Sequence, residues 1–437
     1  MTTPKRYAIA GVSNRAISMF MSAITGKYSD VAQLVAMLDK DTGRMRNYNE
    51  KNGLSLPGYL PDEFDQMVRE TQPDVIIVTC PDSMHHHYIV EALKRDLEVI
   101  VEKPLTIDAE KCAAIAAAAQ TSRATVILTF NYRYTPAATR IRELLAQGKV
   151  GRIVNVELSW YLNTFHGKSY FQRWHRLREN SGGLSITKAC HHFDLVRWWI
   201  DQRPTEVLAY GGLNYYGPNG PHNPLRPDQI GDGRTCGSCD VARHCKYYMK
   251  WASLEEWVRG REEKLDDHLD SNQQYEDYRT DQCIYDPQIN IEDTYGALIK
   301  YEGGAFLSYS LNASVPYEGF RLAINGTEGR IEYKELHGRN ILPFSDPVPE
   351  QPPILYLPLF GGAERIDVVK LEGDHQGADP VILEELFRGP DPLVPVERRA
   401  SIDHGIDAVL TGVAVHRSVN EKKMISVKAM LRNIFPK

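Results

Sequence analysis

The chain has 437 residues, of which 42% are hydrophobic and 25% charged, and its formal net charge is −6. At ~150 residues per domain, this length predicts two or three domains with a sizeable buried core. The acidic balance argues against a nucleic-acid-binding protein, and no apolar run reaches the ~18 residues that a membrane span needs. The first residues enter an apolar strand rather than a signal peptide, and seven cysteines are an odd number for a disulfide framework. We therefore expect a cytoplasmic protein with no membrane or nucleic-acid partner.

Short apolar runs alternate with helical segments over the first third of the chain. We expect strands over 7–10, 34–38, 75–78, 99–101 and 125–128, and helices from Gly11 to about Gly26 and over 109–119. Asp108 is placed to cap the second of these helices. Strands and helices that alternate at this spacing predict a parallel sheet with right-handed crossovers. The fold class expected for residues 1–133 is therefore α/β, a Rossmann dinucleotide-binding domain.

A different pattern begins after residue 133. Apolar and polar residues alternate at period two over 153–158, 297–301, 305–309 and 320–324, which predicts antiparallel strands with one covered face. A polar, Gly/Pro-rich and cysteine-bearing stretch at about 213–290 interrupts this series and is interpreted as an insertion. Residues 134–437 are expected to form a substrate-binding α+β domain with an open, mostly antiparallel sheet.

The turn after the first strand carries part of a dinucleotide-binding pattern. Gly11 stands where a G-x-G-x-x-G turn begins, and Ser13 and Ala16 replace its other glycines, with Asn14 and Arg15 between them. Small residues there let the backbone approach a pyrophosphate at the helix N-terminus. Asp39 ends the second strand where an acid would meet the adenosine ribose, which favours NAD. Lys40 and Arg44 keep NADP open, and an ordinary βα turn remains the alternative.

Three later strand ends should face the same crevice, because ligands bind at the carboxyl ends of strands in open α/β sheets. The third expected strand is followed by Cys80, Pro81 and His85. Glu102 and Lys103 follow the fourth, and Asn131 and Arg133 the fifth. The alternative for Lys103 is a surface lysine paired with Glu102.

Several of these segments together resemble the glucose–fructose oxidoreductase / inositol dehydrogenase / MocA family. They are Glu102-Lys103-Pro104, the turn over 81–85, the segment over 181–194, the Gly326-Thr327-Glu328-Gly329 turn and the segment over 374–379. The resemblance implies NAD(P)-dependent oxidation or reduction of sugars and polyols. It also implies an open C-terminal sheet that often packs against another subunit, so we expect a homo-oligomer, a dimer or tetramer.

The resemblance also implies roles for single residues. Lys103 resembles the lysine that contacts the reacting hydroxyl and the nicotinamide ribose, and His191 resembles the catalytic histidine. Asp194 matches the acid three residues after that histidine. The family's usual aspartate four residues before the histidine is Thr187 here, followed by Lys188. This departure puts a simple polyol dehydrogenase chemistry in doubt.

Hydride transfer from a carbinol needs a base for the hydroxyl proton and a cation for the developing alkoxide. We expect His191 as the base and Lys103 as the cation, or as a second base if burial lowers its pKa. A helix starting at 182–183 would align Thr187, Lys188, His191 and Asp194 along one face, which makes Lys188 a further catalytic candidate. A histidine such as His191, taken alone, is more often structural than catalytic, and His192 is expected to be its structural partner.

The expected substrate-binding residues precede this helix. An aromatic and cationic run suits a sugar face and its hydroxyls or an anionic group, and the alternative is a packed Trp beside solvated arginines. The run contains Arg173, Trp174, His175 and Arg176, and the weaker candidates Tyr161 and Asn163 lie on the first strand of the second domain.

Three functions are compatible with these residues. The leading hypothesis is an NAD-dependent oxidoreductase acting on a carbinol of a sugar, glycoside or polyol. The second is an NAD-dependent glycosidase that oxidises C3 transiently, eliminates and hydrates, with Arg173 and Arg176 suited to an anionic sugar. The third is a non-catalytic sugar or dinucleotide sensor. Net NADH production would separate the first from the second.

Four cysteines in the insertion suggest a structural zinc site. Cys236 and Cys239 form a C-x2-C pair, and Cys245 and Cys283 could complete a tetrahedral set. A polar segment of this size has few residues for a core, so it needs a staple. Disulfides, free thiols and an iron–sulfur cluster are the alternatives.

Overall fold

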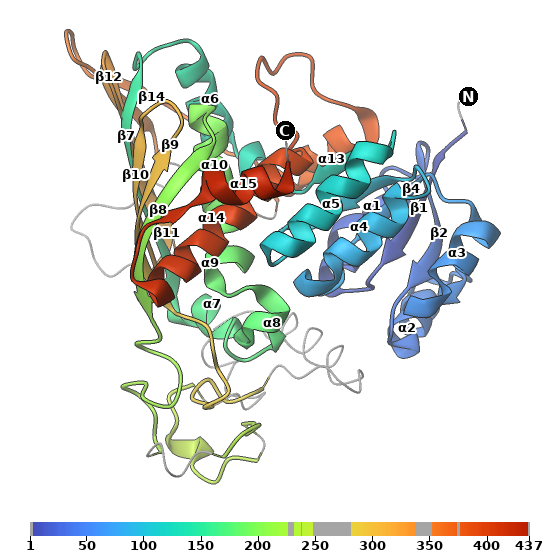
Figure 1. Ribbon diagram of the computed structural model, residues 1–437. Helices are drawn as coiled ribbons and strands as arrows, with labels where there is room; N and C mark the ends of the chain where they lie inside the picture. The colour runs from blue at the N-terminus through green and yellow to red at the C-terminus, as the bar shows by residue number, and fades with distance from the viewer. Residues whose placement is uncertain are drawn as a thin grey trace.

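Two β-sheets organise the chain, with helices packed between them (Figure 1). The structure is a computed structural model that describes residues 3–225, 231–236, 238–247, 281–337, 352–373 and 376–435. The second sheet stands at one side of the molecule and is seen edge-on in Figure 1.

The first sheet is parallel and has six strands in the order β3-β2-β1-β4-β5-β6. The strands are β1 (Lys5–Ala10), β2 (Ala32–Leu38), β3 (Gly58–Tyr59), β4 (Val75–Val78), β5 (Glu98–Val101) and β6 (Val126–Leu128). The connecting helices are η1 (Ala16–Met21, a π-helix), α1 (Ser22–Thr25), α2 (Thr42–Asn52), η2 (Pro61–Glu63), α3 (Phe64–Thr71), η3 (Asp82–Met84), α4 (His85–Leu93), α5 (Ala109–Thr121) and η4 (Asn131–Tyr134). The strand order reverses between β1 and β4, which is where open α/β sheets bind ligands. The expected Rossmann domain is confirmed, and Asp108 caps α5 as predicted.

The second sheet is mostly antiparallel and has nine strands in the order β14-β13-β12-β11-β7-β10-β9-β8-β15. They are β7 (Ile153–Asn163), β8 (Pro204–Gly212), β9 (Thr294–Tyr301), β10 (Phe306–Val315), β11 (Glu318–Gly326), β12 (Gly329–His337), β13 (Ile354–Pro358), β14 (Glu364–Ile366) and β15 (Ile425–Ser426). The pair β7 and β10 is parallel, unlike the other pairs of this sheet. The helices of this half are α6 (Pro136–Ala146), α7 (Thr164–Ser169), η5 (Trp174–Arg176), α8 (Arg178–Ser181), α9 (Leu184–Thr187), α10 (Cys190–Ile200), η7 (Ala242–His244), α13 (Ala378–Arg388), α14 (Ile402–Glu421) and α15 (Val427–Ile434).

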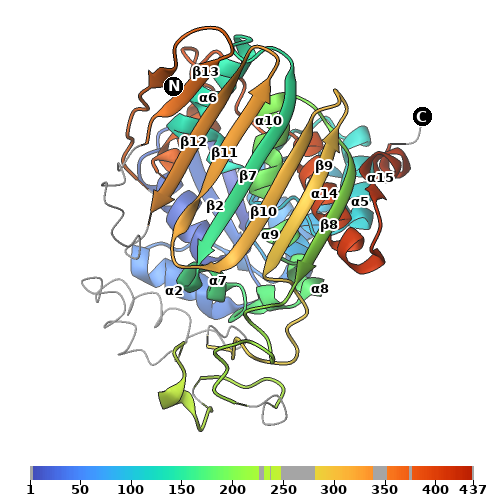
Figure 2. The same cartoon turned by 90° about the vertical axis from the view of Figure 1, so that its left-hand side faces the viewer.

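One face of the second sheet is covered by helices and the other is open. Helices α10 and α14 pack on the inner face, and Figure 2 shows the outer face without a covering helix. Burial alternates strictly along β9, as period two predicts. Large apolar side chains nevertheless stand exposed on the outer face, among them Leu208, Tyr210, Leu298 and Phe306.

Helix α13 returns from the C-terminal half of the chain to the Rossmann domain. Its Phe387 ring packs against Tyr7 and Tyr28, and its Ile382 joins the apolar cluster under the parallel sheet. Although α13 follows residue 133 in the chain, it therefore packs as part of the Rossmann domain and completes its apolar core.

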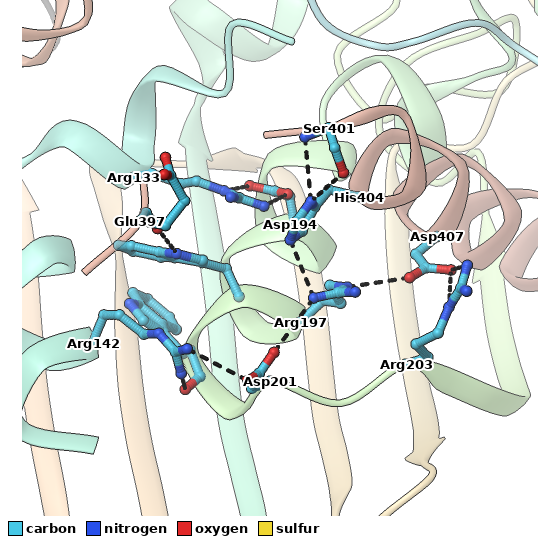
Figure 3. A network of polar contacts seen from close by, with 12 residues as sticks. Arg133, Arg142, Asp194, Arg197, Asp201, Arg203, Glu397, Ser401, His404 and Asp407 are labelled. Carbon is cyan, nitrogen blue, oxygen red and sulfur yellow. Dashed lines mark hydrogen bonds and ion pairs between the residues drawn. The ribbon is translucent and has the colours of Figure 1, made fainter. Parts of the chain in front are cut away.

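A buried polar network joins α10 to α14 and to η4 (Figure 3). Asp194 receives two hydrogen bonds from the Arg133 guanidinium, at 2.6 and 2.8 Å, and both side chains are about 1% exposed. Arg197 binds Asp407 and contacts Nε2 of His404. Burial and the surrounding arginines lower the pKa of His404 to about 2, so this imidazole stays neutral. Arg133 and Asp194 thus hold the fold together.

The insertion is anchored to the second domain by an arginine. The Arg176 guanidinium lies 2.7 Å from the carboxylate of Asp286 and donates to the Gln282 side chain, and it is 2% exposed. The expected role of Arg176 in substrate binding is therefore not retained, because its donors are committed to the insertion.

The zinc prediction is not supported. None of the four insertion cysteines forms a disulfide, and no group of three or more His, Cys, Asp or Glu side chains that could hold a metal ion exists among the described residues. Cys283 does lie near Cys236, Cys239 and Cys245, and burial together with these thiols raises its pKa to about 11. One of the expected zinc ligands, the sulfur of Cys239, accepts a hydrogen bond from Arg234 at 3.6 Å. In the part of the chain that the structure covers, no helix is long and apolar enough to cross a membrane.

Candidate active site

The dinucleotide crevice is shaped by the contact between the ends of β1 and β4. Gly11 has φ +98°, and a Cβ there would lie 2.4 Å from the backbone nitrogen of Cys80. Thr79 Oγ1 donates to the Gly11 carbonyl at 2.6 Å and fixes this approach. Ser13 Oγ accepts from the N–H of Ala16, so it caps the following helix. Only glycine fits at position 11, and the small, capped turn over 11–16 leaves room for a pyrophosphate.

Asp39, the acid expected at the adenosine ribose, is held by the backbone. It follows β2, and its two carboxylate oxygens accept from the backbone N–H groups of Val12, at 2.6 Å, and Asp41, at 2.9 Å. A carboxylate offers about four acceptor sites, so hydroxyl donors can still be bound. Arg44 pairs with Asp41 and donates to the Val12 carbonyl, and Lys40 is exposed.

Arg15 does not face a phosphate but closes one edge of the crevice. Its guanidinium binds Glu102 at 2.9 Å and Asp379 at 2.6 Å. Asn131 Nδ2 donates to the same Asp379 at 2.8 Å. These contacts tie the first turn, the end of β5 and the start of α13 together, so Arg15, Glu102 and Asn131 shape the crevice as a unit.

His85 joins two strand-end loops. Its ring nitrogens lie 2.7 Å from the Pro104 carbonyl oxygen and 2.9 Å from the Cys80 carbonyl oxygen, and the residue is 1% exposed. Pro81 is exposed at the start of the same loop, and Asn14 is exposed in the turn after β1. His85 therefore positions the crevice walls rather than lining them.

Lys103 remains a cation. Its Nζ donates to the Thr187 carbonyl at 3.2 Å, which brings the end of β5 to the segment between α9 and α10. Burial lowers the pKa of Lys103, but Tyr170, Cys190, Asp82 and Glu102 outweigh it and leave the pKa raised. The expectation that burial would turn Lys103 into a second base is thus wrong.

Lys188 has the opposite electrostatics. Burial lowers its pKa to about 8; Glu318 opposes this effect, and the smaller repulsion of the Lys103 charge adds to it. Its Nζ lies 5.7 Å from the ring centre of Tyr132 and 5.8 Å from that of Trp160. The pKa values of Lys103 and Lys188 are therefore shifted in opposite directions.

His191 begins a new helix next to these lysines. The single helix expected from 182–183 is broken by a turn at 188–189 into α9 and α10. The His191 ring packs edge-on against Tyr132 and Phe130, at 5.0 and 5.9 Å between centres. His192 is fully buried, stacks on Trp160 and hydrogen-bonds the Tyr309 hydroxyl at 2.7 Å, which fits a structural partner.

A carboxylate that the sequence motif lacks is supplied from another strand. Asp82, in η3 after β4, hydrogen-bonds the Thr187 side chain and interacts with the Lys103 charge. Burial raises the pKa of Asp82, and His85, Lys103 and Thr187 oppose that effect. In the sequence, Asp82 is marked only by its position at a strand end, in a turn that was otherwise assigned to cofactor binding.

Three further groups surround the lysines and were missed. His166 and Tyr170 lie in and just after α7, and Glu318 begins β11. His166 Nδ1 is 2.6 Å from Glu318 Oε1, and its Nε2 is 3.5 Å from the Tyr170 hydroxyl. These residues are 152 and 4 positions from His166, and no local pattern marks them.

Two expected substrate residues face elsewhere. Tyr161 alternates with buried Trp160 and so points to the outer face of the sheet. The Asn163 side chain caps α7 by accepting from Phe165 and His166. Trp160, one position from Tyr161, is the side chain that reaches Lys188.

The run over 173–176 lies only partly at the site. Trp174 and His175 stack at 3.7 Å, and the His175 ring packs edge-on against Tyr170. Burial, with the nearby Arg173 and Lys103 charges, lowers the pKa of His175 well below its ordinary value. The half-buried Arg173 is thus the one arginine of the run that stays available to an anionic group.

The two domains match two descriptions of one family. "Oxidoreductase family, NAD-binding Rossmann fold" fits residues 5–130, and "Oxidoreductase family, C-terminal alpha/beta domain" fits residues 142–428. A Bacillus subtilis protein named YteT and described as an oxidoreductase is 44% identical over 98% of this chain and 99% of its own length. The chain therefore belongs to the glucose–fructose oxidoreductase / inositol dehydrogenase / MocA family of oxidoreductases, and it is an enzyme with an NAD-binding Rossmann domain.

More distant relatives have several activities. The inositol 2-dehydrogenase of Rubrobacter xylanophilus is 28% identical over 41% of this chain and 48% of its own length. The 2,7-anhydro-N-acetylneuraminate hydratase of Escherichia coli is 24% identical over 39% and 46%. The WlbA dehydrogenase of Bordetella pertussis, solved with NADH and UDP-GlcNAcA, shares the fold at a TM-score of 0.61 and 14% identity, over 97% and 99% of the two chains. At that identity the structural likeness concerns the fold alone.

Proposed function

We propose that the protein is an NAD-dependent oxidoreductase that acts on a carbinol of a sugar, glycoside or polyol. The observation that carries the proposal is the pair of neighbouring lysines at the end of β5 and the start of α10, with the pKa of one raised and that of the other lowered to about 8. A general base is most effective when its pKa lies near the working pH, and an alkoxide needs a permanent cation. Lys188 and Lys103 meet these two requirements.

The residues at the crevice fit a dinucleotide. Gly11 provides the turn that a Cβ would fill, and Asp39 provides ribose acceptors. When bound with its nicotinamide near Lys103, NAD would supply the acceptor for the hydride of the carbinol carbon. Lys103 holds the substrate oxygen, and Lys188 or His191 takes the hydroxyl proton. Asp82 is one of the groups that keep Lys103 charged.

Aromatic rings around the lysines support a carbohydrate substrate. Tyr132, Trp160 and Tyr170 contact the lysines or their neighbours, and sugars present apolar faces to such rings. Arg173 offers a charge for an acidic substituent.

The test is a panel of free sugars, polyols, glycosides and uronates incubated with NAD, with reduced-nicotinamide absorbance and product release followed together. Turnover should fall strongly in Lys103→Met and in His191→Ala, and the double variant should be much less impaired than the product of the two effects. Unchanged turnover in Lys103→Met would refute the assignment.

A redox-neutral glycosidase is the second candidate. A relative named as a hydratase lies among the family members found, and hydration is one step of that chemistry. Release of an aglycone without accumulation of reduced nicotinamide would establish this candidate over the first.

We also propose a homo-oligomer that covers the outer face of the nine-stranded sheet. The exposed Tyr210, Leu298 and Phe306 lie on strands of that face, and a sheet face of this kind is usually buried against a partner.

A further inference from the structure

The oxidation proposed above produces a proton that must leave a buried site. Lys188 and His191 are each 5% exposed, and Tyr170 is 7% exposed. The His166 imidazole is different, since 37% of its side chain is exposed. His166 is thus an imidazole of this cluster that is also open to solvent.

Hydrogen bonds orient the imidazole in one direction. Glu318 Oε1 lies 2.6 Å from His166 Nδ1, and Glu318 Oε2 accepts from the Asn163 N–H at 3.1 Å. Asn163 Oδ1 in turn accepts from the His166 backbone N–H at 2.8 Å. Since a carboxylate only accepts, Nδ1 must carry the proton in neutral His166, and Nε2 is left as an acceptor.

The acceptor nitrogen faces a phenol that reaches Lys103. Tyr170 Oη lies 3.5 Å from His166 Nε2, and the two rings stack at 5.6 Å between centres. Such contacts are often long in an empty site and shorten with substrate. Burial raises the pKa of Tyr170 to about 12, and the Lys103 ammonium opposes this, so the phenol keeps its proton and can donate it to Nε2.

We propose that Tyr170 and His166, with Glu318 as the positioning residue, form the path by which the substrate proton reaches solvent. The inference rests on the proposed oxidoreductase function. In each oxidation two electrons and the carbinol hydrogen leave as hydride to the nicotinamide, and one proton leaves the hydroxyl. Tyr170 takes that proton, directly or from Lys188, as it gives its own to His166 Nε2. The imidazolium, stabilised by Glu318, then gives a proton to water, so all three residues return to their starting states.

Burial and the lysine charges near His166 favour its neutral form, so that the imidazole can pass a proton on without staying protonated. Burial, and then the Lys188 charge, lower the pKa of His166, and Lys103 adds to the effect, whereas Glu318 opposes it. His175 packs edge-on against Tyr170 and has a strongly lowered pKa, so it is neutral and does not compete for the proton. His166 is therefore neutral at rest and ready to accept.

The first arm of the test reads the tautomer in the cofactor-free protein. The 15N chemical shifts of His166, assigned by their loss in His166→Gln, should show a protonated Nδ1 and a bare Nε2 at neutral pH. Glu318→Gln should weaken this preference, and Tyr170→Phe should shift Nε2 by removing its donor. A proton on Nε2 in the unmodified protein would overturn the relay.

The second arm measures turnover on the best substrate of the sugar panel. We expect His166→Ala to lower kcat at least ~10-fold, with the KM for NAD unchanged and kcat restored by imidazole in the buffer. Tyr170→Phe should lower kcat without rescue. His87→Ala, at an exposed histidine of α4, is the matched control. Its kcat should equal that of the unmodified protein, and imidazole should not change it. Full turnover in His166→Ala, or a loss that imidazole does not restore, refutes the relay, whereas no turnover in the unmodified protein refutes the proposed function.

Discussion

Replacing Lys188 with methionine should stabilise the protein while it removes the proposed base. The shift of the Lys188 pKa from 10.5 to about 8 corresponds to a cost of about 3 kcal/mol for the buried ammonium, at about 1.4 kcal/mol per unit. Cation–π contacts with Tyr132 and Trp160 return about 1 kcal/mol of this cost. We therefore expect Lys188→Met to raise the free energy of unfolding by about 2 kcal/mol at pH 7.

The gain should depend on pH in a defined direction. Below pH 8 Lys188 is charged in both the folded and the unfolded chain, so the whole cost is present. Between pH 8 and pH 10.5 the unfolded chain keeps a proton that the folded chain has lost, so the stability of the unmodified protein rises with pH. The advantage of Lys188→Met should therefore shrink as pH rises through this window.

The assay is urea unfolding followed by tryptophan fluorescence at several pH values. Lys94→Met, at an exposed lysine of the first domain, is the matched control and should show no such pH dependence. In the same pH range, kcat/KM for oxidation should rise with a midpoint near pH 8 and level off above it, and this limb should vanish in Lys188→Met. A pH-independent difference in stability, or a less stable Lys188→Met at pH 7, would refute the assigned pKa and the role built on it.

Three other predictions concern the cofactor, the core and the assembly. Asp39→Ala should weaken NAD binding by ~1–3 kcal/mol in calorimetry, and tighter binding of NADP than NAD by the unmodified protein would contradict the ribose assignment. Asp194→Asn leaves Arg133 charged and poorly paired in the interior, so urea unfolding should show a loss of about 3–5 kcal/mol; a loss below about 1 kcal/mol would mean that water or another group compensates. Tyr210→Glu with Leu298→Asp should reduce the mass measured by light scattering to that of one chain, and an unchanged mass would place any interface elsewhere.

The local sequence pattern was enough to predict an element whose structure depends on residues within or next to it. The strand β4 matches its expected range of 75–78 residue for residue, because a four-residue apolar run between polar turns has no other low-energy use in a parallel sheet. Helix α5 begins at Asp108 because its carboxylate accepts from the Lys111 N–H, a contact that the sequence spacing alone predicts.

The sequence pattern failed to predict site residues where the strand register decides which face a side chain takes. It also failed where a residue distant in the chain decides what a side chain binds. Tyr161 and Trp160 are equally aromatic, and only the register of β7 against β10 and β11 turns Trp160 toward Lys188. Arg133 stands at a strand end, as a cofactor contact would, yet Asp194 sits 61 positions away and takes its guanidinium into the core. An arginine beside a crevice and one beneath it look the same in a sequence.

The carboxylate near Lys103 shows how the same chemistry can be rebuilt from another place in the chain. The family pattern leads one to look for an acid at position 187, where this protein has a threonine. Thr187 and Asp82 are hydrogen-bonded through their side chains, and the Thr187 carbonyl accepts from Lys103 Nζ. The pKa of Lys103 is raised first by Tyr170 and Cys190 of the second domain, and Asp82 of the Rossmann domain adds to their effect. At Lys188 it is burial that brings the pKa into the range of a working base: Glu318 opposes the effect of burial, and the repulsion of Lys103 adds to it.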